Sequence, residues 1–102
     1  MEIIKKLSKM IHEEIEDAEK YTKCAIKYKD TMPEVAQVFY NLGNEELSHM
    51  EKLHSAVNRV ISDYRAKHGD PPVAMQAVYD YLHEEQIEKV KEVKLLQEQY
   101  RH

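Results

Sequence analysis

The sequence contains few of the residues that interrupt helices or cross-link a chain. Its 102 residues include two glycines, three prolines, no tryptophan and one cysteine. With a single cysteine, Cys24, the chain forms no internal disulfide, and this cysteine usage is typical of a reducing compartment such as the cytoplasm. The simplest interpretation of Cys24 is a small buried side chain.

Long apolar runs and a strong charge of one sign are also missing. The net charge is −4, and basic residues are interleaved with acidic ones. We therefore find neither a basic stripe for nucleic acid nor an acidic tail. The amino terminus has no apolar run of the length that a signal peptide or a membrane span requires. Nucleic acid and membranes are thus not expected among the partners of this protein.

The residues that are present favour α helix. Ala, Glu, Lys, Leu and Gln are more prominent than runs of β-branched residues, which predicts a single all-α domain over residues 1–102. Pro33 and the segment Gly69-Asp70-Pro71-Pro72 divide the chain into helices at about 3–30, 34–67 and 73–101. The first connection is short, so the first two helices are expected to form a long antiparallel hairpin.

Each predicted helix carries a stripe of apolar residues at steps of three and four, the spacing of one helix face. On the first helix the stripe is Ile4, Leu7, Ile11, Glu14, Ala18, Tyr21, Ala25 and Tyr28. On the second it is Val35, Phe39, Leu42, Glu46, His49, Leu53, Val57, Val60 and Tyr64. On the third it is Met75, Tyr79, Leu82, Gln86, Val90, Val93, Gln97 and Tyr100.

Three ionisable residues interrupt the first two stripes at their midpoints: Glu14, Glu46 and His49. Counted from the turn between the helices, the three positions lie at similar heights and are able to converge. Burying a carboxylate or an imidazole in an apolar interface costs several kcal/mol unless something compensates, and a metal ion does so. The pattern therefore predicts a metal site at Glu14, Glu46 and His49, and Glu-x-x-His is the spacing found in dinuclear carboxylate bundles.

One chain supplies half of such a site, because the third helix has no second Glu-x-x-His. A homodimer, or a higher even oligomer, would complete four helices and six ligands around a two-fold axis. Carboxylates with imidazole suit iron or manganese better than structural zinc. A di-iron or manganese site with open positions for dioxygen or peroxide is the chemistry that this ligand set predicts.

The residues around Glu14 and Tyr21, with Val35–Phe39 and Glu45–Leu53, resemble one half of a rubrerythrin or ferritin-like bundle over about residues 10–60. In size and layout the chain is most similar to the encapsulated ferritins, in which two hairpins form a ferroxidase site between subunits. The resemblance implies a ferritin-like four-helix bundle completed by dimerisation. It implies iron ligation by Glu14, Glu46 and His49, and acidic residues near metal entry at Glu13 and Glu16. A cargo-targeting tail and a rubredoxin module are absent.

Two other interpretations are open at this stage. The polar residues of the stripes could specify pairing in a non-catalytic helical interaction or scaffold module. The protein could also be a metal sensor or carrier without turnover. The remaining histidines have surface or capping roles as their simplest interpretation. His83, near the core side of the third helix, and His54, about one turn past the site, are candidates for an additional ligand or supporting role.

Overall fold

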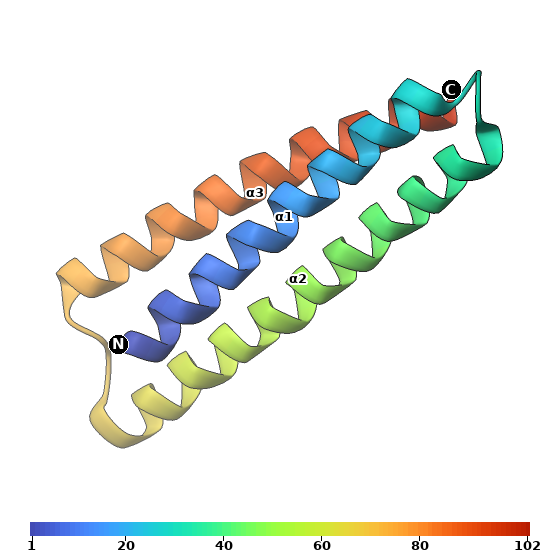
Figure 1. Cartoon of the computed structure of the whole chain (residues 1–102). Coiled ribbons are helices and arrows are strands. Elements are labelled where there is room, and N and C mark those ends of the chain that lie inside the picture. Colours follow the sequence, from blue (N-terminus) through green and yellow to red (C-terminus); the bar gives the residue numbers. More distant parts are fainter.

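The computed structural model describes residues 1–102 as three long α helices without strands (Figure 1). Helix α1 spans Glu2–Tyr28, α2 spans Pro33–His68 and α3 spans Val73–Arg101. The predicted all-α class is confirmed, and every helix begins and ends within two residues of its predicted bounds. The Cα trace measures 56 × 18 × 17 Å, so the molecule is a rod about as long as α2 itself.

The two breaks between the helices follow from proline and glycine chemistry. Pro33 is the first residue of α2, a position where a missing amide hydrogen costs no helical bond. Gly69 ends α2 with a φ of 77°, which glycine adopts without a steric penalty, and its N–H donates to the Arg65 carbonyl at 3.0 Å. The short first connection makes α1 and α2 antiparallel neighbours, as the sequence predicts.

The core lies along α1, which packs against both other helices. Its buried residues include four members of the predicted stripe, Ile4, Ile11, Ala18 and Ala25. A cluster in the middle of the rod joins the three helices, with Ile11, Ile15 and Ala18 from α1, Leu47 from α2 and Val93 from α3. Only 12 of the 102 residues are buried, so the three helices leave much of their apolar surface accessible.

The most buried residues of α2 lie to one side of the apolar stripe that the sequence predicts as the contact face. Its buried residues are Ala36, Gly43 and Leu47, and the predicted stripe residues are half-buried or exposed. The reason is the close approach that small residues allow: a Cβ on Gly43 would lie 2.9 Å from Thr22 Oγ1. The predicted stripe of α2 therefore lies about 100° around the helix from these buried residues, although Phe39 of the stripe still contacts α1 by stacking on Tyr21 and Tyr28.

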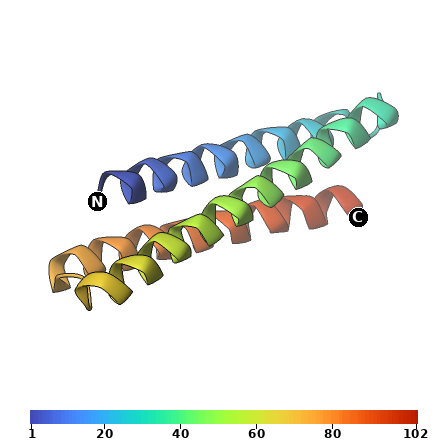
Figure 2. The same ribbon diagram turned by 90° about the horizontal axis from the view of Figure 1, so that it is seen from below.

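Helices α2 and α3 are joined mainly by polar side chains, and Figure 2 shows α2 running obliquely between α1 and α3. We call these contacts the polar seam. Along the rod they pair Asn44 with Gln97 at 2.7 Å, His54 with His83 at 3.1 Å and Arg65 with Gln76 at 3.3 Å. Apolar packing thus holds α1 in place, whereas α2 and α3 meet through hydrogen bonds, a stack of Tyr40 on Tyr100 and the central apolar cluster.

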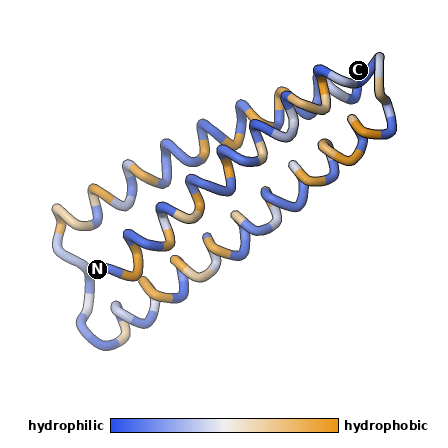
Figure 3. Tube along the Cα trace, in the orientation of Figure 1, coloured by the Kyte–Doolittle hydropathy of each residue, from blue (hydrophilic) through white to orange (hydrophobic).

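Hydrophilic residues interrupt the hydrophobic ones along every helix, as Figure 3 shows. No helix of the structure combines the length and the apolar character that crossing a membrane requires.

Candidate metal centre

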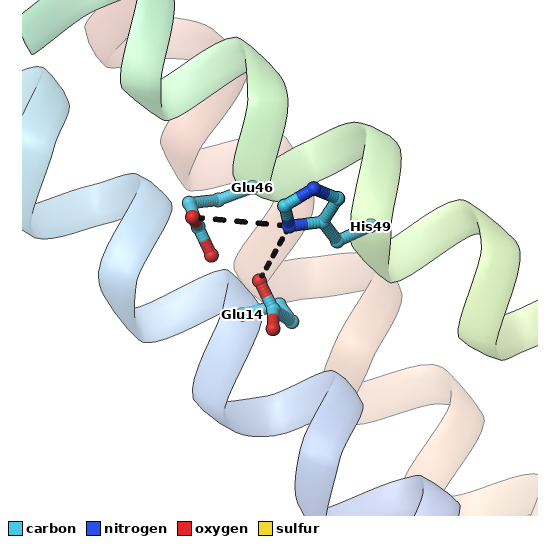
Figure 4. A group of neighbouring side chains, drawn as sticks. All are labelled: Glu14, Glu46 and His49. Atoms are coloured by element: carbon cyan, nitrogen blue, oxygen red, sulfur yellow. Dashed lines mark ion pairs between the residues drawn. The ribbon is translucent and has the colours of Figure 1, made fainter.

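The structure brings the three sequence-predicted ligands together. Glu14 projects from α1, and Glu46 and His49 project from α2, so that one ligand atom of each lies within 4.8 Å of the others (Figure 4). His49 Nδ1 is the common point: it lies 3.4 Å from Glu14 Oε2 and 3.9 Å from Glu46 Oε1. This convergence requires the equal heights that the hairpin gives to the three residues.

Local structure explains how the two helices present these side chains. Glu46 and His49 are three residues apart on an uninterrupted helix, so they lie on one side of α2, one turn apart. Gly43 lies three residues before Glu46 and allows α2 to approach α1 closely at Ala18 and Thr22. The close contact beside the site is what brings a carboxylate of α1 within reach of α2.

The site lies at the rim of the α1–α2 contact and is not enclosed. The Glu14 and Glu46 side chains are 25% and 17% exposed, whereas the His49 side chain is 52% exposed. The expectation of a dry interior is therefore wrong for His49. The buried face of α2 is centred on Ala36, Gly43 and Leu47, so His49 lies outside it, on the solvent side of the contact.

One oxygen of the site has no hydrogen-bond partner. Glu14 Oε2 is buried and makes no hydrogen bond in the structure. Buried polar atoms in proteins are nearly always paired, so an unpaired carboxylate oxygen needs an explanation. Its nearest basic atom is the imidazole nitrogen at 3.4 Å, which is an ion pair only when His49 is protonated.

The two carboxylates disturb each other. The hydrogen bond between Glu46 and Glu14, the partial burial of Glu46 and the negative charge of Glu14 raise the pKa of Glu46 from 4.5 to about 7, against a lowering effect of His49. Near neutral pH the pair therefore tends to retain one proton. A bound cation would replace that proton, since it attracts both carboxylates at once.

The other sequence candidates do not reach this centre. Glu16 is bonded to His12 at 2.8 Å on the exposed side of α1, and Glu13 is exposed. His54 and His83 pair with each other, apart from the Glu14–Glu46–His49 group. The contact between these two histidines was not predicted, because a stripe pattern contains no information on the register between α2 and α3.

The possible ligand atoms of the site are carboxylate oxygens and one imidazole nitrogen, and solvent reaches them on the side of His49. Such a mixed oxygen and nitrogen set suits Fe²⁺ or Mn²⁺. Helix α3 contributes no ligand and passes behind the three side chains in the view of Figure 4. The site therefore has one side on which additional ligands could be supplied from outside the chain.

Comparison with known protein families, curated proteins and solved structures finds no match to this chain. The likeness to ferritin-like proteins accordingly depends on the residues of the chain alone.

Proposed function

We propose that this chain is a ferritin-like metal-binding protein that holds iron or manganese through Glu14, Glu46 and His49. The observation that carries the proposal is the buried Glu14 Oε2, which makes no hydrogen bond, at the point where the three ligand atoms converge. Leaving a carboxylate oxygen buried without a partner costs free energy, on the order of 1–3 kcal/mol. A divalent cation removes that cost and the repulsion between the two carboxylates together.

The proposed site is completed by a second copy of the chain. The α2 stripe that contains Glu46 and His49 is only partly covered within the chain. Phe39 stacks on α1 tyrosines, and Leu53 and Val57 pack on the core cluster, yet the apolar members of the stripe stay half-buried or exposed. Val35 is 39% exposed, and Phe39 and Leu42 are half-buried on the same side. In a two-fold dimer this stripe would pair with its own copy, which would assemble a four-helix bundle and bring a second Glu-Glu-His set to the first.

Iron held in this way supplies one-electron chemistry toward dioxygen or peroxide, which would make the protein a ferroxidase or a peroxide scavenger. The chain's own residues provide the rest. Glu14 and Glu46 supply negative charge that favours the higher oxidation state, and they take up a proton when the metal leaves. His49, half exposed, lies between the carboxylates and the solvent.

The test is anaerobic titration of tag-free protein with Fe²⁺ and Mn²⁺, followed by exposure to air, elemental analysis and mass in solution. We expect stoichiometric binding, a change in absorbance on oxidation and the mass of an even oligomer. Glu14→Gln and Glu46→Gln should each weaken binding by at least about tenfold, since loss of even a supporting residue has that effect. Glu45→Gln, an exposed neighbour with the same change in charge, is the matched control.

Absence of stoichiometric binding, or equal binding by Glu46→Gln and Glu45→Gln, would overturn the proposal. Binding without oxidation would support the metal site but contradict the proposed oxidative activity, and it is the result expected of a sensor or carrier.

A second candidate is a non-catalytic interaction module, and the exposed apolar residues favour it. Val35 and Val38 on α2 and Leu95 on α3 are 39%, 55% and 65% exposed. In that case the polar residues select the pairing of helices. Replacing Glu14 and His49 by Leu would then change the mass in solution and leave metal content unaffected.

A further inference from the structure

His54 and His83 form a contact that the proposed centre does not use. His54 Nε2, on α2, lies 3.1 Å from His83 Nδ1, on α3, and the two rings stack with centroids 4.7 Å apart and planes 16° apart. The pair occupies the middle of the polar seam, between the Asn44–Gln97 and Arg65–Gln76 contacts. Two metal-ligating nitrogens thus face each other across two helices that share little apolar contact.

The separation of the two nitrogens fits a shared metal ion. Zinc binds imidazole nitrogen at about 2.0–2.1 Å. Two such ligands on one ion are about 2.9 Å apart at a right angle and about 3.3 Å apart at the tetrahedral angle. The observed 3.1 Å lies between these values. The stacked rings would have to turn about their side-chain torsions to direct both in-plane lone pairs at one ion. The hydrogen atom now shared by the rings would move to the outer nitrogen of its own ring, which leaves both inner nitrogens free to coordinate.

From this geometry we propose that His54 and His83 form a second metal site, specific for a divalent ion that prefers imidazole, such as Zn²⁺ or Cu²⁺. Imidazole ligands without carboxylates suit these ions better than iron or manganese. No acidic side chain is near enough to be a third ligand within the chain, so water fills the remaining positions. The ion would join α3 to α2 at a polar contact between the two helices.

The surroundings of the pair allow an ion to enter. A groove of about 450 Å³ contains both histidines, together with Asp80 and Gln86, and a second groove of about 530 Å³ reaches the pair on the side of Glu51. Burial, with a smaller effect of His83, lowers the pKa of His54. This shift favours the neutral imidazole, the form that binds a metal.

The second site is independent of the first. His54 follows His49 by five residues, which is one full turn and about 140° more around the helix. The two histidines of α2 thus point to different sides of the helix. Neither site contributes a ligand to the other, so loss of one leaves the other able to bind.

The experiment uses the tag-free Glu14→Gln/Glu46→Gln double variant, in which the first centre is removed, titrated with Zn²⁺ and Cu²⁺. We expect one equivalent of either ion to bind and Cu²⁺ electron paramagnetic resonance to show two imidazole nitrogens. At a hundredfold excess over Kd, Zn²⁺ should raise Tm by about 11–22 °C. Adding His54→Gln or His83→Gln should abolish the shift, whereas His68→Gln, an exposed histidine on α2, should not.

Equal Tm shifts in the His83→Gln and His68→Gln variants, or a copper spectrum with one nitrogen, would overturn the proposal. Circular dichroism monitors folding of each variant. If His54→Gln loses helix content, His83→Gln decides alone, because His83 is exposed and its replacement leaves no cavity. If the double variant does not bind zinc while the parent chain still binds iron, the proposed His54–His83 site is wrong and the proposed Glu14–Glu46–His49 site stands.

Discussion

Replacing Glu46 by Gln should stabilise the metal-free protein at alkaline pH and at the same time weaken its metal binding. Glutamine keeps the size of the side chain and can still hydrogen-bond to Glu14, but it carries no charge. The hydrogen bond to Glu14, partial burial and the Glu14 charge raise the pKa of Glu46 to about 7. The ionised form of Glu46 is therefore disfavoured in the folded chain.

The sign of the pH dependence follows from linkage. The folded chain holds the Glu46 proton more tightly than the unfolded chain, in which the pKa is 4.5. Folded and unfolded chains are both protonated below about pH 4.5, and no penalty exists there. As pH rises from about 4.5 to about 7 the unfolded chain loses its proton first, so the free energy of unfolding of the metal-free protein falls.

The size of the effect has an upper limit set by the pKa. A rise from 4.5 to about 7 corresponds to roughly 3 kcal/mol at 1.36 kcal/mol per unit. Solvent reaches the site through His49, whose side chain is 52% exposed, and screening by water reduces the penalty. We expect Glu46→Gln to gain about 1 kcal/mol at pH 8, or a rise in Tm of about 4–8 °C, and almost nothing at pH 4.5.

Urea unfolding of chelator-treated protein at pH 4.5 and pH 8 measures this difference, and Glu45→Gln controls for the change in net charge. A loss of stability at pH 8 in Glu46→Gln would refute the reasoning, because it would make the three polar residues a stabilising network. The same result would favour the non-catalytic module over the metal site.

Two further predictions concern packing. Gly43→Ala should destabilise the protein by about 1 kcal/mol in urea unfolding, although helices favour alanine. The new Cβ would lie 2.9 Å from Thr22 Oγ1, and this hydroxyl is held in place by its 2.7 Å hydrogen bond to the Ala18 carbonyl. Adding Thr22→Ala should therefore recover the loss. Val93→Ala should cost about 1–3 kcal/mol in the same assay because Val93 is fully buried, whereas Val73→Ala, at a residue 87% exposed, should change stability by less than about 0.5 kcal/mol.

The sequence was enough to predict where the three helices begin and end, but not which face of each helix is buried. Proline and glycine chemistry predicts the helix ends, and counting residues from the turn predicts that Glu14, Glu46 and His49 meet. The stripe rule ranks large apolar residues and so gave no weight to Gly43, which is buried where α2 approaches α1 closely. That error is why His49 is half exposed instead of enclosed.

For a related reason, the spacing of apolar residues along each helix could not predict the register between α2 and α3. The seam between them depends on pairs of polar residues that are far apart in the chain, such as Gln97 and Asn44. Each partner alone looks like an ordinary surface residue, and only the path of residues 69–72 decides which ones meet. The metal, the dimer and the activity stay predictions that the experiments above test.

The same small residue connects stability to the proposed centre. Gly43 lies one turn before Glu46, and its close contact with α1 sets the distance from Glu14 Oε2 to His49 Nδ1, which is 3.4 Å. Gly43→Ala should therefore weaken Mn²⁺ binding several-fold in anaerobic titration, beyond its effect on folding. Val93→Ala, on α3, should lower stability as much or more and leave Mn²⁺ affinity unchanged. If both variants lose affinity in proportion to their loss of stability, the contact at Gly43 does not position the ligands, and the helices need only be folded for the metal to bind.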